Sequence, residues 1–153
     1  MAMNAADGIM ASLKWPLLGG LSAVAVLSCS DADWSRADKE NAVHFIKAVT
    51  YSVQAIQINN ASGPGVVSQA HIDQILRLNK AALAEAAMVR DDILDRVHPE
   101  LRQHFREEWQ RGLQLVNRNL QFGDVQAEVE GQRLLDKWGT WYMSNLRDIR
   151  IPK

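Results

Sequence analysis

The chain has 153 residues, of which 17 are lysine or arginine and 18 are aspartate or glutamate. This length supports one domain with a proper hydrophobic core and is too short for two domains of ordinary size. Because the charges nearly balance, no global field draws the protein onto nucleic acid or onto an anionic membrane surface. The single cysteine excludes an internal disulfide and leaves no partner for a zinc site or a redox pair. We therefore expect one domain and no nucleic-acid partner.

The first predicted element is a targeting segment. Lys14 precedes the uncharged run WPLLGGLSAVAVLS at residues 15–28. A membrane-spanning helix needs about 20 apolar residues, and this run is shorter and is broken by a proline and two glycines. It therefore favours a signal peptide over residues 1–28 and predicts that the rest of the chain is exported. A start at Met10 would give a more compact signal layout, so residues 1–9 are also open to interpretation as a mis-assigned start.

The apolar run ends in Val26, Leu27, Ser28 and Cys29. This tetrapeptide resembles the lipobox of bacterial lipoproteins, in which small or branched apolar residues precede a cysteine. In that family the thiol is alkylated with diacylglycerol, the signal peptide is cut before the cysteine, and the new amino terminus is commonly acylated. The resemblance implies that Cys29 is lipidated and becomes the first residue of the mature protein, with residues 29–34 as a tether. Several acyl chains make a durable membrane anchor, since one chain binds a bilayer only marginally.

The residue after the cysteine bears on location. In typical Gram-negative sorting, an aspartate directly after the lipidated cysteine favours retention in the inner membrane. Here that position is Ser30, and Asp31 comes one residue later, so the resemblance implies anchoring at the periplasmic face of the outer membrane. Two alternatives stay open: an uncleaved N-terminal helix that holds the chain in the inner membrane, and an ordinary signal peptide cut at another site.

The apolar pattern after the tether predicts a first helix over residues 35–60. Ser35 and Asp38 form a variant of the capping box that often begins a helix. Apolar residues then recur at a spacing of three and four, which is typical of an amphipathic helix: Ala42, Phe45, Ile46, Val49, Val53 and Ile56. The asparagines, glycines and proline of NNASGPGVVS, residues 59–68, predict a loop after it.

The same spacing predicts three further helices. A second helix, capped by Ser68, covers residues 68–97. Pro99 ends it and suits the first turn of a third helix that reaches Phe122. A fourth helix begins at the Asp124 cap and is supported by acidic residues near its positive end. Four helices of similar length with short connections predict an all-α fold, an antiparallel four-helix bundle with up-down-up-down topology over residues 35–150.

No arrangement of residues indicates catalysis or metal binding. The histidine and glutamates of HFREEW, residues 104–109, lack the Glu-x-x-His motif that di-iron bundles require. The three aspartates of RDDILDRVH, residues 90–98, lack the glycine turn of a calcium-binding EF-hand loop. Nucleotide loops, haem-attachment motifs and nucleophile elbows are also missing from the sequence. We therefore expect no enzymatic activity, no catalytic residue, no metal, and no cofactor beyond the lipid on Cys29.

The most distinctive stretch of the body is WGTWYM, in which Trp138, Trp141 and Tyr142 lie on one side of a helix. In one interpretation these rings fill the wide end of the core against Trp109 and Phe105. In the other they form a partly exposed aromatic patch that contacts a partner or a small apolar ligand. Gly139 lowers helix stability at this point and predicts room for a neighbouring backbone.

These observations predict a lipid-anchored helical bundle that faces the periplasm. We expect it to act as an interaction or assembly module of the cell envelope, with an envelope protein as partner and self-association left open. A first alternative is a carrier that holds a small apolar molecule between its helices, with the aromatic cluster lining the pocket. A second alternative is an immunity or exclusion lipoprotein that neutralises a toxin or blocks an incoming phage or conjugating cell.

Overall fold

The computed structural model describes residues 34–61 and 68–152. Within these two ranges the chain is all-helical, which confirms the predicted fold class, and no residue belongs to a strand. The predicted signal peptide, Cys29 and most of the tether lie outside the described residues. The elements are α1 (Arg36–Ala61), α2 (Gln69–Met88), α3 (Asp91–Val97), α4 (Leu101–Gln103), a π-helix (His104–Gln110), α5 (Arg111–Phe122) and α6 (Val125–Asn145).

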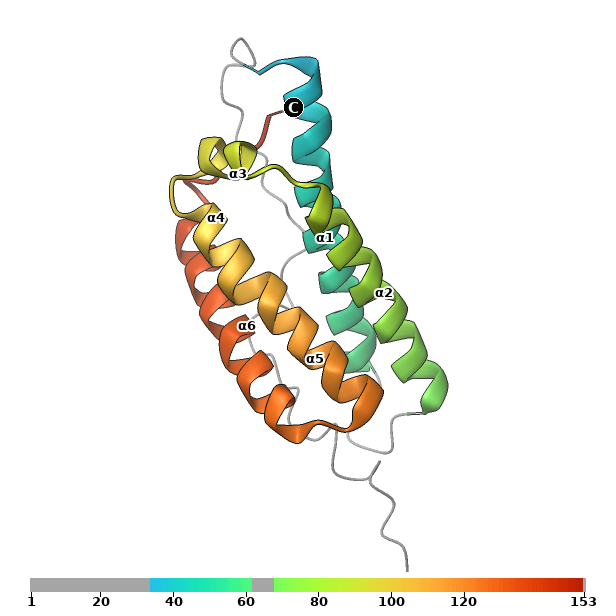
Figure 1. Cartoon of the computed structure of the whole chain (residues 1–153). Helices are drawn as coiled ribbons and strands as arrows, with labels where there is room; N and C mark the ends of the chain where they lie inside the picture. The colour runs from blue at the N-terminus through green and yellow to red at the C-terminus, as the bar shows by residue number, and fades with distance from the viewer. Residues whose placement is uncertain (1–33, 62–67, 153) are drawn as a thin grey trace, which may run out of the picture.

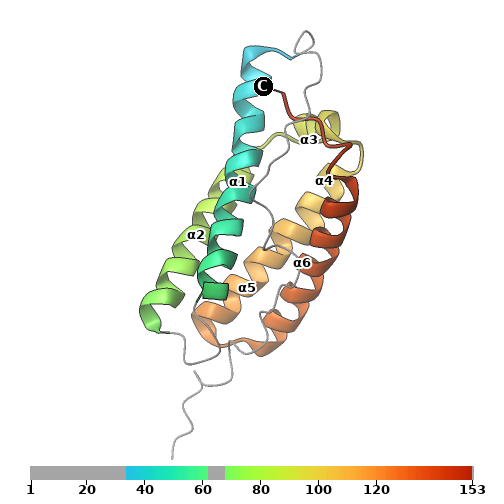
Figure 2. The same ribbon diagram turned by 180° about the vertical axis from the view of Figure 1, so that it is seen from behind.

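The long helices form two antiparallel pairs (Figure 1). Helix α1 packs along α2, and α5 packs along α6. The pairs meet mainly through α2 and α5, whereas α1 and α6 stay farther apart on the opposite side, as Figure 2 shows. The short helix α3 lies across the end of the molecule at which α1 begins, and α4 is the first turn of the long helix that continues through the π-helix into α5. The C-terminal segment returns to this end, where the Arg150 amide donates a hydrogen bond to the Val97 carbonyl at 3.1 Å.

Side-chain caps begin the helices where the sequence predicts them. The hydroxyl of Ser35 accepts a hydrogen bond from the Asp38 amide at 3.1 Å. Ser68 caps α2 in the same way, and the Asp124 carboxylate accepts a hydrogen bond from the Ala127 amide at the start of α6. Gly123 ends α5 with a φ of 69°, a left-handed conformation that glycine adopts without steric cost. These local signals therefore set the helix boundaries.

The predicted second helix is wrong in one respect, because it is not continuous over residues 68–97. Helix α2 ends at Met88 and α3 begins at Asp91, with an extended backbone at Val89 and Arg90. Val89 is still buried, so the apolar spacing runs on across the break. The sequence pattern for this reason gives no sign of the interruption.

Side chains from other helices stabilise the extended backbone between α2 and α3. The Asn41 amide of α1 donates to the Met88 carbonyl at 2.8 Å and accepts from the Arg90 amide at 2.8 Å. From the π-helix, the Arg106 guanidinium donates to the Val89 carbonyl at 2.6 Å. The backbone groups that lose their helical partners therefore find new ones, which offsets the cost of ending the helix.

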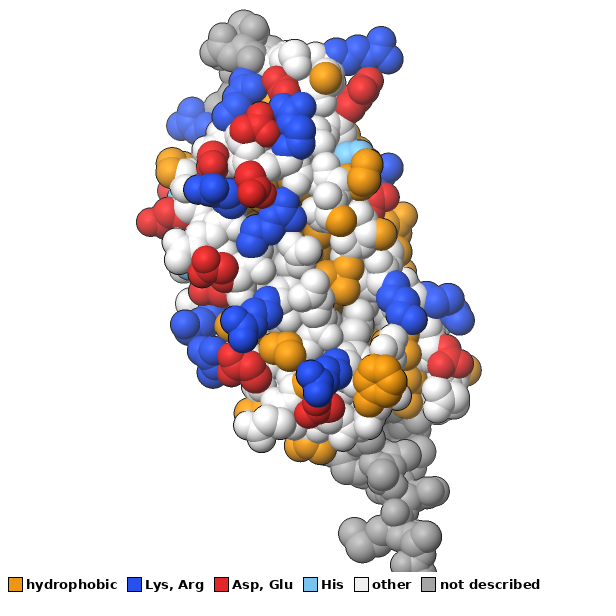
Figure 3. All heavy atoms as spheres, in the orientation of Figure 1, with side chains coloured by type: hydrophobic (Ala, Val, Ile, Leu, Met, Phe, Trp, Pro, Cys, Tyr) orange, Lys and Arg blue, Asp and Glu red, His pale blue; other side chains and the backbone are white. Residues whose placement is uncertain are grey.

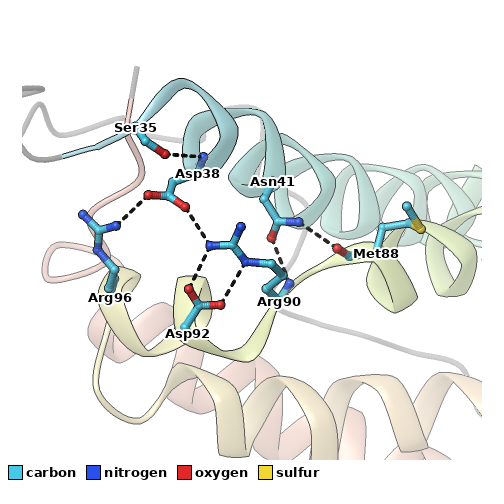
Figure 4. A network of polar contacts seen from close by, with 7 residues as sticks. All are labelled: Ser35, Asp38, Asn41, Met88, Arg90, Asp92 and Arg96. Carbon is cyan, nitrogen blue, oxygen red and sulfur yellow. Dashed lines mark hydrogen bonds and ion pairs between the residues drawn. The ribbon is translucent and has the colours of Figure 1, made fainter.

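A charged network ties the start of α1 to α3 (Figure 4). The Asp38 carboxylate accepts hydrogen bonds from Arg90 at 2.7 Å and from Arg96 at 3.0 Å. Arg90 also pairs with Asp92, and the Arg96 guanidinium lies 4.0 Å from the ring centre of Trp34. The hydrogen bond from Ser35 and the neighbouring Arg90 lower the pKa of Asp38 below its ordinary value of 3.8.

The predicted third helix is continuous but is not a regular α-helix. The segment from His104 to Gln110 is a π-helix, which adds backbone between α4 and α5. Its buried residues, Phe105 and Trp109, continue the apolar stripe between Leu101 and Leu113. Three successive spacings of four residues exceed the 3.6 residues of an α-helical turn, so a wider helix keeps all four side chains on the core side.

Helices α5 and α6 cross at two glycines. A methyl group on Gly131 would lie 2.9 Å from the Gly112 carbonyl oxygen and 3.0 Å from Leu115 Cβ. The backbones therefore approach each other more closely than any larger residue allows. The predicted close approach at Gly139 is wrong, because a methyl group there would meet no atom within 4 Å.

The surface carries mixed charge. Figure 3 shows positive and negative side chains interspersed over one face, with apolar side chains between them. None of the helices in residues 34–61 and 68–152 combines the length and the apolar character that a membrane span requires.

Candidate functional site

Two of the three predicted site residues lie in the core. Trp138 and Tyr142 are each only 4% exposed, and their ring centres lie 4.9 Å apart. Trp138 also packs edge-on against Phe105 at 6.0 Å, and Phe105 stacks on Trp109 at 4.7 Å. A connected layer of aromatic rings thus joins α6 to the π-helix. This arrangement agrees with the interpretation of these rings as core packing.

Trp141 lies at the outer edge of this layer, with its ring centre 5.7 Å from that of Trp138. It is partly buried and stacks on His104, with ring centres 4.3 Å apart, while His98 meets it edge-on at 5.3 Å. Its indole N–H donates to a Glu100 carboxylate oxygen at 3.2 Å. The three predicted residues therefore do not form a single exposed patch, because only Trp141 reaches toward the surface.

An apolar cavity of about 50 Å³ lies between the two helix pairs. Its aromatic wall is formed by Trp109, Trp138 and Tyr142, and Gly139 contributes its backbone. The remaining lining residues come from α1, α2, α5 and α6: Val49, Ser52, Val53, Ala55, Ile56, Asn59, Ile75, Asn79, Leu113, Val116, Leu120 and Leu135. The cavity is partly open to the surroundings.

Small residues among large ones explain why this space is not filled. Ala55 and Ser52 of α1 and Gly139 of α6 line the cavity with little or no side chain. Helices α1 and α6 are not among the closely packed helix pairs, and a methyl group at Gly139 would meet no atom within 4 Å. The space at Gly139 predicted for a neighbouring backbone therefore belongs to this cavity instead.

The main polar side chains of the lining are engaged in internal hydrogen bonds. The Ser52 hydroxyl donates to the Val49 carbonyl at 2.8 Å and accepts from the Trp109 indole N–H at 3.3 Å. The Asn79 amide donates to the Asn117 side-chain oxygen at 2.9 Å. These bonds satisfy groups that would otherwise attract water or a polar ligand. An occupant of the cavity thus meets a mainly hydrocarbon surface.

Tyr142 is the one residue of the cavity lining whose pKa is shifted. Burial raises the pKa of its phenol to about 12, because the low-polarity surroundings disfavour the phenolate. The ring is therefore neutral near pH 7. It offers an apolar face to the cavity and no base for acid–base catalysis.

The polar residues singled out in the sequence form hydrogen bonds and ion pairs with their neighbours. His104 pairs with Glu108 at 2.8 Å, and Asp91 pairs with Arg106 at 2.9 Å. Over residues 34–61 and 68–152, no group of three or more histidine, cysteine, aspartate or glutamate side chains is placed to hold a metal ion. The cavity is therefore the part of the described structure best suited to bind a ligand.

Comparison of the chain with protein-family models, with curated proteins and with solved structures finds no match. The geometry of the cavity and the residues around it are thus the basis for the function proposed below.

Proposed function

We propose that this domain binds a small apolar molecule, or the apolar end of a larger one, in the cavity between its helix pairs. The observation that supports this proposal is an apolar space whose aromatic wall is formed by Trp109, Trp138 and Tyr142. Pockets for small ligands are mostly apolar and commonly lie between the helices of bundles. Each methylene group buried there contributes about 0.8 kcal/mol.

The volume limits the kind of occupant. An apolar cavity of roughly 150 Å³ takes up benzene or xenon, and the cavity here measures about 50 Å³. A xenon atom or the end of a hydrocarbon chain suits this space better than a complete ring. A bulkier ligand requires α1 and α6 to move apart. We expect this movement because α1 and α6 are not among the closely packed helix pairs.

Native mass spectrometry tests the proposal on the Cys29→Ser variant, which carries no lipid at this position and is purified without detergent. We expect an added mass that corresponds to a small apolar molecule, and we expect it to be lost in a Gly139→Leu variant. The leucine side chain enters the open space at position 139 and occupies the cavity. A Gly139→Ala variant is the matched control, since its methyl group takes up little of the space. An added mass that persists in Gly139→Leu would place the ligand elsewhere. Absence of the added mass from the parent protein and from both Gly139 variants would contradict the proposal.

We also propose, on the sequence resemblance, that the domain is tethered to the outer membrane through lipid on Cys29 and faces the periplasm. In this view the two helix pairs act together as an antiparallel, up-down-up-down four-helix bundle. The intact mass of membrane-extracted protein tests the anchor: we expect a chain that begins at Cys29 and carries acyl groups. A full-length, unmodified mass would contradict it, and a Cys29→Ser variant is the control.

A second candidate function is the interaction module of the cell envelope. It is favoured by apolar side chains exposed around the turn between α5 and α6, where Phe122 is 78% exposed and Val125 and Val129 are also exposed. Such clusters often mark protein contacts. We expect Phe122→Ser to leave the melting temperature unchanged and to abolish co-purification of an envelope protein. An unchanged set of co-purified proteins would contradict this function.

A further inference from the structure

A buried carboxyl group lies between α5 and α6 and takes no part in the cavity. Glu128 is only 9% exposed, and its Oε2 atom accepts a hydrogen bond from the Asn119 side-chain amide at 3.2 Å. Asn119 itself is 1% exposed. Among the described residues, three buried side-chain oxygen atoms have no hydrogen-bond donor: Glu128 Oε1 and Asn119 Oδ1 of this pair, and Gln132 Oε1 four residues farther along α6. This site thus has more hydrogen-bond acceptors than donors.

The charged groups nearby are engaged elsewhere. On α5, Arg118 pairs with Asp124 at 2.8 Å. On α6, Glu130 pairs with Arg133 at 2.7 Å. No ion pair to Glu128 occurs in the part of the chain that the structure describes.

The other charged residues that face α6 lie away from Glu128. Arg111 of α5 is close enough to lower the pKa of Glu130. The π-helix packs against α6 near Trp138, as the contact of Phe105 with that ring shows, and its Glu108 is close enough to raise the pKa of Arg133. Glu128 occupies the other end of α6, next to Asn119.

Burial therefore determines the state of this carboxyl group. Loss of solvation raises the pKa of Glu128 above its ordinary value of 4.5. The positive end of α6 favours the ionised form and opposes this shift. A carboxylate here would be buried with a single neutral donor, which is an unfavourable arrangement.

We propose that Glu128 is a proton-binding site that keeps its proton in the folded protein at pH values where exposed glutamates are ionised. The proton on Oε1 is donated to one of the two oxygens that lack a donor, Asn119 Oδ1 or Gln132 Oε1. With Asn119 as acceptor, acid and amide form a reciprocal pair, because the amide already donates to Oε2. Loss of the proton leaves a buried carboxylate facing acceptor oxygens and loosens the contact between α5 and α6.

The sign of the pH effect follows from the direction of the shift. The folded protein holds the proton at pH values where the unfolded chain has released it. The contribution of Glu128 to the free energy of unfolding therefore falls as the pH rises above about 4.5. The loss is complete above the pKa of Glu128 in the folded state.

Two measurements test this proposal on the full chain. Carbon-13 NMR of the glutamate carboxyl groups reports the protonation of Glu128 directly, and we expect it to titrate above the exposed glutamates. Urea unfolding is then followed from pH 4 to pH 9 for the wild type, Glu128→Gln and Glu130→Gln. Glutamine supplies an N–H donor where the proton would be, so we expect the wild type to lose stability relative to Glu128→Gln as the pH rises.

Glu130→Gln is the matched control, because Arg133 lowers the pKa of Glu130 and the sign reverses. Removal of Glu130 should cost stability above about pH 4.5. The proposal is overturned if the Glu128 carboxyl titrates with the exposed glutamates, or if the wild type and Glu128→Gln lose stability in parallel. It is also overturned if added sodium, potassium or calcium stabilises the wild type but not Glu128→Gln, since a cation would then satisfy the three oxygens.

Discussion

The crossing of α5 and α6 yields the sharpest prediction for stability, the substitution Gly131→Ala. The new methyl group would lie 2.9 Å from the Gly112 carbonyl oxygen, 3.0 Å from Leu115 Cβ and 3.1 Å from a Val116 methyl carbon. Because the nearest atom belongs to the backbone, the two helices must separate, and overpacking of this kind costs about 1–3 kcal/mol. Alanine regains about 0.8–1 kcal/mol through its better helix propensity. We therefore expect a net loss of about 0–2 kcal/mol.

Gly139→Ala is the matched control on the same helix. A methyl group at position 139 meets no atom within 4 Å, so only the gain in helix propensity applies and stability should rise by about 0.5–1 kcal/mol. Urea unfolding followed by circular dichroism measures both changes. For a chain of this size, each kcal/mol corresponds to about 2–4 °C in melting temperature. Equal stability of Gly131→Ala and Gly139→Ala would refute the close backbone approach.

Three further predictions concern other parts of the fold. Asn41→Ala should lose about 1–2 kcal/mol in thermal unfolding, because it removes two hydrogen bonds to the break after α2; an unchanged melting temperature would show that the break does not depend on them. Trp138→Ala should lose about 3–5 kcal/mol because it empties a buried site, whereas retained stability would contradict its role in the core. Since Ser35 and Arg90 lower the pKa of Asp38, the wild type should lose stability relative to Asp38→Asn as the pH falls below about 4; parallel pH curves would contradict this.

The helix boundaries could be predicted because the signals that set them are local. Ser35, Ser68 and Asp124 each bind an amide three residues later, and Gly123 ends α5 with its own backbone conformation. The break at residues 89–90 could not be predicted in this way. It depends on side chains that are distant in sequence, and the buried spacing continues through it.

The candidate site was only partly predictable. The sequence singled out Trp138, Trp141 and Tyr142 as one aromatic group, but only Trp138 and Tyr142 line the cavity, whereas Trp141 stacks on His104. The role of Gly139 was misjudged, because sequence does not reveal whether a small residue faces a neighbouring backbone or an open space. The π-helix places Trp109 beside the cavity. The sequence signal for it is the apolar stripe in which successive buried residues lie four positions apart.

The uptake of xenon tests the central proposal most directly, because its size suits a small apolar cavity. Methyl-labelled protein is titrated with xenon under pressure and followed by carbon–proton NMR. We predict saturable shifts at the lining methyl groups, including Val53, Ile56 and Val116, and the loss of these shifts in Gly139→Leu. Shifts that do not saturate, or that persist in the filled variant, would contradict binding between the helix pairs.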